Sequence, residues 1–219
     1  TEHEVVPSSV FVELAVRAGD EVGCDRIDEL VTETWCVLPA NGLRVQVVVG
    51  APDELGKRSV AVYSRGEDDW TRHATGTMTA SRPTAERPAA DGDVVGDVSL
   101  LDASGFGLHP NLLDEAARLV SDDLLPATWR GVTLHATGAT ELRVRVSEGA
   151  DGGVVVALAD GTGAPVATVD SLVLRAVSAD QLAAARDVVD SLFRVDWVEV
   201  PVPDEQSDVE VMSAPGGLD

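Results

Sequence analysis

Basic residues are scarce in this sequence: 16 Lys and Arg stand against 38 Asp and Glu, which gives a formal charge of −22 over 219 residues. Binding to nucleic acid or to an anionic membrane surface draws on clustered Lys and Arg, so this balance argues against both partners. No apolar run comes close to the ~20 residues of a membrane-spanning helix. Thr1-Glu2-His3-Glu4 lacks the basic start of a signal peptide. We therefore expect a cytoplasmic protein.

Cysteine is scarce as well, and with it the side chains that hold metals. Cys24 and Cys36 are too few for a disulfide framework, and reduced thiols are the simpler interpretation. No two histidines have metal-ligand spacing and none lies near a cysteine, so we expect no metal site. A glycine-rich phosphate loop is also missing, and we expect no cofactor. The absence of a Gly-x-Ser-x-Gly motif argues against a serine hydrolase of that type. The histidines are His3, His73, His109 and His135.

Hydrophobic residues are plentiful, at 44% of the chain, which is too many for a disordered protein. A helix is predicted over Ser8–Asp20, because apolar residues recur there at helical spacing. Alternating apolar and polar residues then predict strands at 43–50, 59–64 and, less strictly, 70–79. The first part of the chain is therefore expected to be one helix followed by an antiparallel meander.

The same order of elements recurs further along the chain. A helix is predicted over Pro110–Val120, where a proline suits the first turn and the apolar residues form a stripe. Strands are predicted after it at 129–136, 141–147, 153–160 and 165–176. The pattern predicts an α+β protein in which two antiparallel sheets each wrap a central helix, related by a pseudo-twofold.

Composition indicates where these two units begin and end. Residues 81–97, rich in Ser, Arg, Pro, Ala and Asp, are expected as a linker between a first half at 1–80 and a second half at 98–177. A short helix and a strand are expected within 178–200. The acidic, Gly- and Pro-rich residues 201–219 are expected to form a disordered tail.

Asp114 is the candidate catalytic residue. It lies five residues after His109 and directly after two leucines of a mostly apolar helix. A carboxyl group that is desolvated in this way holds its proton more readily and can act as a general acid. The alternative is an acidic residue near a helix N-terminus that is stabilised by the helix dipole.

A resemblance to a known family favours the catalytic interpretation. Phe106-Gly-Leu-His-Pro-Asn-Leu-Leu-Asp-Glu-Ala116 resembles the His-Pro-x-x-x-Asp motif of dehydratase domains from modular type I polyketide synthases. Residues 190–198 are similar to the strand that opens the ketoreductase structural subdomain downstream. The resemblance runs from about residue 5 to 200 and implies a double hotdog fold. Further similar stretches follow the family's order: Val6–Asp20, Trp70–Gly76, Thr128–Val144 and Gly163–Arg175.

The resemblance also implies residue roles and partners. A histidine of the first hotdog would remove the α-proton of a β-hydroxyacyl chain, which an acyl carrier protein presents on phosphopantetheine. Asp114, in the second hotdog, would protonate the leaving hydroxyl, and His109 and Pro110 are candidate substrate-binding residues. The implied partners are the acyl carrier protein, the neighbouring acyltransferase and ketoreductase regions, and a second copy of the chain.

The family's histidine is not found at its motif spacing. It belongs to a His-x-x-x-Gly-x-x-x-x-Pro motif whose proline Pro7 matches, and counting back nine positions from Pro7 reaches beyond Thr1. His3 lies only four residues before Pro7, with Glu2 in the glycine position. Either the base is lost, or a deletion has moved the only nearby candidate, which is His3, or the family histidine lies upstream of Thr1.

Two further departures from the family's motifs lie within the chain. Arg118 takes the place of a Gln or His and, one helical turn from Asp114, is expected to pair with it. The tunnel-lining Gly-Tyr-x-Tyr-Gly-Pro-x-Phe segment is absent before residue 97, and the loop after the Asp114 helix is short. We therefore expect a degenerate, inactive dehydratase-like domain that acts as a structural and dimerisation spacer. The alternative is an active dehydratase or double-bond isomerase on a carrier-bound β-hydroxyacyl or enoyl chain.

Overall fold

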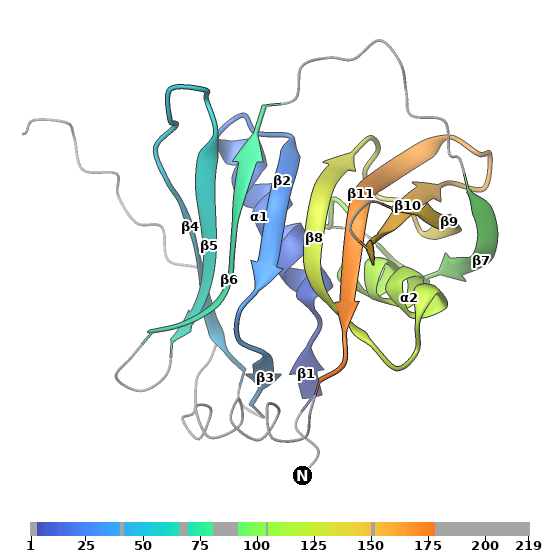
Figure 1. Cartoon of the computed structure of the whole chain (residues 1–219), viewed down its shortest axis with the longest axis horizontal. Coiled ribbons are helices and arrows are strands. Elements are labelled where there is room, and N and C mark those ends of the chain that lie inside the picture. The colour runs from blue at the N-terminus through green and yellow to red at the C-terminus, as the bar shows by residue number, and fades with distance from the viewer. Residues whose placement is uncertain are drawn as a thin grey trace, which may run out of the picture.

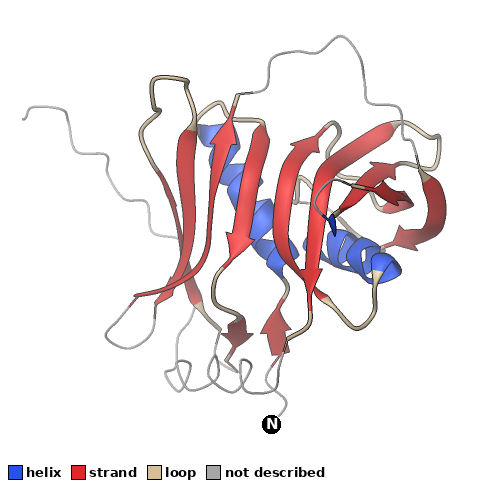
Figure 2. Ribbon diagram, in the orientation of Figure 1, coloured by secondary structure: helices blue, strands red, loops and turns tan. Residues whose placement is uncertain are grey.

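The computed structural model describes residues 4–39, 42–65, 70–80, 92–103, 105–149 and 152–177. Two helices and eleven strands are formed within these ranges (Figures 1 and 2). In chain order they are β1 (Glu4–Val6), α1 (Ser8–Glu21), β2 (Arg26–Thr32), β3 (Cys36–Leu38), β4 (Arg44–Val49), β5 (Arg58–Arg65), β6 (Trp70–Thr79), β7 (Asp93–Ser99), α2 (Pro110–Val120), β8 (Leu125–Leu134), β9 (Glu141–Glu148), β10 (Val154–Ala159) and β11 (Pro165–Arg175).

One antiparallel sheet of nine strands passes through both halves of the chain, in the order β4-β5-β6-β2-β8-β11-β10-β9-β7. A separate two-stranded sheet pairs β1 with β3. Figure 1 shows the long sheet curling around α1 on the side of the first half and around α2 on the side of the second. The two sheets expected from the sequence are thus joined edge to edge.

The two halves share one topology. In the first, α1 is followed by β2 and then by β4, β5 and β6; in the second, α2 is followed by β8 and then by β9, β10 and β11. Within the sheet the order β4-β5-β6-β2 corresponds strand for strand to β9-β10-β11-β8. The internal repeat, the α+β class and the double hotdog architecture are therefore confirmed.

Both helices and most strands lie where the sequence predicts them, and β2 and β7 are the main omissions. β7 spans Asp93–Ser99, so residues 93–97 of the expected linker belong to a strand of the second half. β2 has no clean alternation of apolar and polar residues, yet it lies inside the sheet between β6 and β8. The remaining linker residues 81–91 and the segments expected at 178–200 and 201–219 lie outside the described residues.

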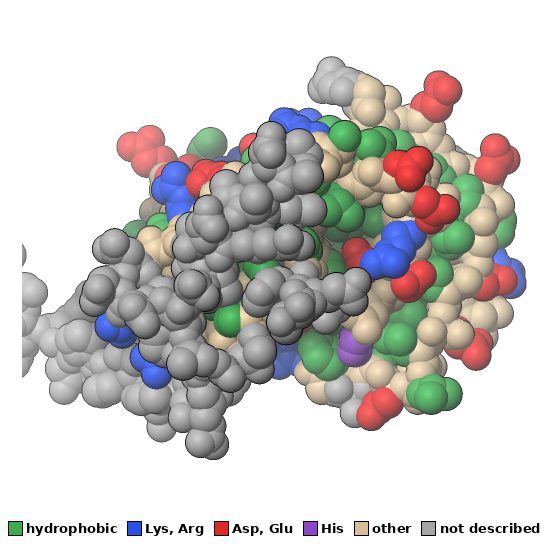
Figure 3. Space-filling view, turned by 90° about the horizontal axis from the view of Figure 1, so that it is seen from below, with side chains coloured by type: hydrophobic (Ala, Val, Ile, Leu, Met, Phe, Trp, Pro, Cys, Tyr) green, Lys and Arg blue, Asp and Glu red, His purple; other side chains and the backbone are tan. Residues whose placement is uncertain are grey.

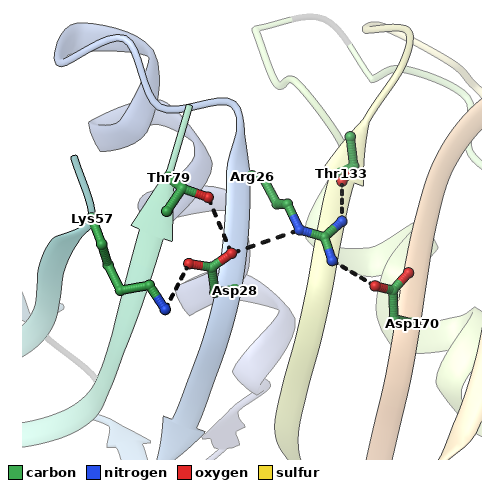
Figure 4. Close-up of polar contacts among 6 residues, drawn as sticks. All are labelled: Arg26, Asp28, Lys57, Thr79, Thr133 and Asp170. Atoms are coloured by element: carbon green, nitrogen blue, oxygen red, sulfur yellow. Dashed lines mark hydrogen bonds and ion pairs between the residues drawn. The ribbon is translucent and has the colours of Figure 1, made fainter. Parts of the chain in front are cut away.

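The charged residues of β2 are paired on the sheet surface, which explains why a strand can carry them. Arg26 binds Asp170 of β11 and donates to Thr133 of β8 (Figure 4). Asp28 pairs with Lys57 at 3.2 Å and accepts a hydrogen bond from Thr79 of β6. These partners are far away in the sequence, so local pattern could not indicate them.

The interior is apolar and also contains a buried polar contact between the halves. Leu112 of α2 and Trp129 of β8 are each 1% exposed. The indole Nε1 of Trp129 donates to Ser8 Oγ at 2.9 Å, and Ser8 Oγ donates to the Pro126 carbonyl at 2.9 Å. Since Ser8 begins α1, this contact fixes the start of the first helix against the second half.

His73 of β6 is a buried histidine of the first half. Its Nε2 lies 2.7 Å from Ser64 Oγ, its Nδ1 lies 3.1 Å from the Thr34 carbonyl oxygen, and its ring stacks on Phe11. Burial lowers the pKa of His73 below its ordinary value of 6.5. The folded protein therefore keeps this imidazole neutral at a pH where the unfolded chain protonates it.

We expect this histidine to make the fold sensitive to mild acid. Above about pH 6.5 the imidazole is neutral in both the folded and the unfolded chain, and the lowered pKa does not affect stability. As the pH falls from there stability is lost, because the unfolded chain binds the extra proton. Between pH 8 and pH 5 the thermal unfolding midpoint of the unmodified protein should fall more steeply than that of His73→Gln. Parallel declines in the two proteins would contradict this.

Candidate active site

Asp114 lies on the buried side of α2, where the apolar stripe of the helix faces the core. Leu112 and Leu113 are 1% and 2% exposed, and Asp114 itself is 9% exposed. The helix begins at Pro110, preceded by His109 at the N-cap. The motif thus places a carboxylate within an otherwise apolar contact surface, as the sequence predicts.

Arg118 pairs with Asp114 along the helix. Its Nε lies 3.1 Å and its Nη2 3.0 Å from the same oxygen, Asp114 Oδ2. The Asp114 side chain is 12% exposed and that of Arg118 59%, so a largely buried carboxylate pairs with a side chain that reaches the solvent. The pairing predicted from the i,i+4 spacing is confirmed. A proton on Oδ2 would point at two N–H donors.

His109 and Pro110 are occupied by the start of the helix. The Nδ1 atom of His109 accepts a hydrogen bond from the Asn111 backbone N–H at 3.1 Å, which caps α2. Its ring packs edge-on against Phe106 with 4.3 Å between the centroids, and Pro110 is buried. Their role in substrate binding stays a prediction.

The candidate base lies outside the described residues, because these begin at residue 4 and the candidate is His3. Two other histidines are engaged elsewhere: His73 contacts Ser64 and Thr34, and His135 contacts Thr168 Oγ1 at 3.1 Å. The described residues thus place the acid of the expected pair and leave the base unassigned.

Glu13 is a functional candidate that the sequence did not single out. It lies on the buried side of α1, 4% exposed, and accepts the backbone N–H groups of Gly107 and Leu108. Arg17 donates to the same carboxylate at 2.9 Å. An acidic residue on the apolar face of the predicted helix, among Phe11 and Ala15, was the available signal.

A cavity of about 280 Å³ lies between the halves, away from this motif. It is lined by residues of α1, β2 and β6 and by residues 134–137 at the end of β8, and neither Asp114 nor His109 lines it.

Viewed from below, Figure 3 shows acidic side chains spread over the second half. Within the described ranges, no cluster of His, Cys, Asp and Glu could hold a metal ion, and neither helix has the length and apolar character of a bilayer-spanning one.

Comparison with known proteins gives a consistent result. A family model described as "Polyketide synthase dehydratase domain" matches residues 1–65. Polyketide synthase GfsA of Streptomyces halstedii is 42% identical over 91% of this chain, and the mycoketide-CoA synthase of Mycobacterium tuberculosis is 38% identical over 90%. The chain spans only 4% and 6% of the lengths of these two relatives.

Solved structures of dehydratases are similar in both sequence and shape. One of them comes from work on dehydratase substrate selection for the borrelidin and fluvirucin polyketide synthases. It is 35% identical to this chain, with a TM-score of 0.72, and the match covers 81% of this chain and 83% of the solved one. The erythromycin dehydratase shares 32% identity, with a TM-score of 0.68 over 78% of this chain and 82% of that one.

The relatives are longer than this chain within the region that aligns. The GfsA alignment extends over 264 positions, whereas 91% of this 219-residue chain is about 199 residues, which leaves roughly 65 positions without a counterpart here. The mycoketide-CoA synthase alignment extends over 257 positions with 90% of the chain, or about 197 residues, which leaves roughly 60. The matched region of this chain is therefore shorter than the corresponding regions of both relatives.

We expect the Asp114–Arg118 pair to contribute little to folding stability. Because Arg118 is 59% exposed, Arg118→Gln should lower the free energy of unfolding by no more than about 1 kcal/mol in urea. Leu112→Ala, at a position 1% exposed, should cost about 2–5 kcal/mol. A loss of that larger size for Arg118→Gln would show that the pair belongs to the structural core.

Proposed function

The chain belongs to the dehydratase domains of polyketide synthases, and from this premise we propose that it is a dehydratase-type domain without dehydratase activity. In this proposal it acts as a structural spacer between neighbouring regions of a modular synthase. Its own contribution would be a folded body of fixed size.

Dehydration of a β-hydroxyacyl chain requires two coordinated proton transfers. A base removes the α-proton, and an acid delivers a proton to the hydroxyl group that leaves as water. Each group must lie within hydrogen-bond reach of its atom, about 2.6–3.2 Å. The acid must also carry its proton on an oxygen that is free to meet the hydroxyl group.

The pair between Arg118 and Asp114 is the observation that carries the proposal. Both guanidinium contacts end on Asp114 Oδ2, at 3.1 and 3.0 Å. To reach this oxygen, a substrate hydroxyl would have to displace the Arg118 guanidinium, which is charged and contacts the oxygen through two nitrogens. Charge-assisted pairs of this kind are among the stronger hydrogen bonds. One of the two oxygens of this carboxylate is thus held by Arg118 of the same helix.

The shortened chain supports the proposal from the substrate's side. Roughly 60–65 aligned positions of two relatives have no counterpart, and the tunnel-lining segment of the family is missing from the sequence. The described cavity does not include Asp114. An acyl chain would therefore lack the walls that hold it against the acid.

The scaffold, in contrast, is complete. All eight repeat strands pair within one sheet, and the interior is closed by large side chains such as Trp129 and Leu30, each 1% exposed. A spacer requires only that the fold is retained, and it does not require a working acid. We expect the acyltransferase and ketoreductase regions of the same module as neighbours, together with a homodimer formed through the first half.

The proposal predicts that no water is lost when the domain, within its own polypeptide, meets a 3-hydroxyacyl group on its acyl carrier protein. Intact-protein mass spectrometry would follow the carrier and look for a decrease by one water. Asp114→Asn should behave like the unmodified domain, because the acid already has no role. Arg118→Gln tests whether release of the ion pair alone is enough, and we expect no turnover there either.

Two controls make a negative result informative. A family dehydratase with an intact histidine motif should remove water from the same substrate. An enoyl carrier in deuterated water should gain no deuterium, since double-bond isomerisation would exchange a carbon-bound hydrogen. Water loss or deuterium gain that disappears in Asp114→Asn would overturn the proposal and establish the domain as a dehydratase or an isomerase.

A further inference from the structure

A buried carboxylate of the first half holds the segment that leads into the helix of Asp114. Glu13 Oε1 accepts the Gly107 N–H at 2.9 Å, and Glu13 Oε2 accepts the Leu108 N–H at 3.0 Å. Gly107 and Leu108 come directly before His109, the N-cap of α2. One side chain of α1 thus binds the backbone from which α2 starts.

The held segment is also fixed from its other side. The Gly107 carbonyl accepts the N–H of Gly138, in the loop after β8, at 3.2 Å. A Cβ atom at position 107 would lie 3.2 Å from Leu134 Cδ2 and 3.4 Å from Glu13 Oε2. The backbone can approach the carboxylate this closely because residue 107 has no side chain.

The charge of Glu13 is satisfied entirely by directed donors. Besides the two backbone groups, Arg17 Nε donates to Oε1 at 2.9 Å, while Glu13 itself is only 4% exposed. A buried carboxylate is stable only when it is hydrogen-bonded in this manner. Since two of the three donors belong to the second half, the arrangement links α1 to the start of α2.

We propose that Glu13 is a positioning residue that sets the location of α2 relative to α1, and with it the distance of Asp114 from the first half. The alternative is that Glu13 merely adds stability to a core that other contacts already position. The proposal does not depend on whether Asp114 is catalytically active, because it concerns the separation of the two helices.

Glu13→Gln distinguishes the two explanations. An amide can accept only one of the two backbone N–H groups and presents an N–H of its own to the other. Spin labels attached through Asp20→Cys and Glu115→Cys, both at exposed positions, would report the distance between α1 and α2. We expect a broadened or shifted distance distribution in Glu13→Gln, and about tenfold faster amide exchange at Gly107 and Leu108 than in the unmodified protein.

Two matched variants keep the result specific. Arg17→Gln removes the exposed donor and retains both backbone hydrogen bonds, and Ile27→Val weakens the core elsewhere. Both should leave the distance distribution unchanged. If Glu13→Gln lowers the unfolding midpoint but keeps the narrow distribution and the slow exchange, Glu13 is only a stabilising residue and the proposal is wrong. Neither readout measures water loss, so failure here is separate from failure of the proposed function.

Discussion

The pairing of β2 with β8 is the contact on which the rest of the structure depends. It places Leu30 opposite Trp129 and turns two four-stranded repeats into one sheet, extended by β7. Because each repeat curves around its own helix, joining them along this seam brings α1 and α2 into one interior. Ser8, Trp129 and Pro126 then connect the start of α1 to the second half, and Glu13 connects the middle of α1 to the start of α2. The contact between Glu13 and the segment before α2 depends on this junction.

Within that frame, folding and chemistry have separate requirements. The core needs Leu112 and Leu113 on the inner face of α2, and both are present and buried. Dehydration needs an acid on the same helix that the substrate can reach, whereas Arg118 contacts Oδ2 of Asp114. A substitution at position 118 changes one exposed side chain, so it can remove a function without disturbing the packing. A double hotdog can therefore be retained after its chemistry is lost, as the proposed role as a spacer requires.

Local sequence patterns were sufficient for the helices, most of the strands and the Asp114–Arg118 pair, because each depends on residues a few positions apart. They were insufficient for β2, whose charges are balanced by Lys57, Asp170 and other partners distant in sequence. β7 was partly assigned to the linker because Asp93, Gly96 and Asp97 interrupt its apolar residues. Glu13 was missed for the same reason as β2: its partners, Gly107 and Leu108, lie more than 90 residues away.

The central claim is that Oδ2 of the acid in the family motif is held by Arg118 of the same helix, and a substrate-bound structure tests it most directly. The domain within its full polypeptide would be crystallised with a 3-hydroxyacyl-phosphopantetheine. The account predicts that both Arg118 contacts to Asp114 Oδ2 persist, at their present 3.0–3.1 Å, and that no substrate hydroxyl reaches this oxygen. An Arg118 side chain turned toward solvent, with the substrate hydroxyl hydrogen-bonded to Asp114, would contradict it.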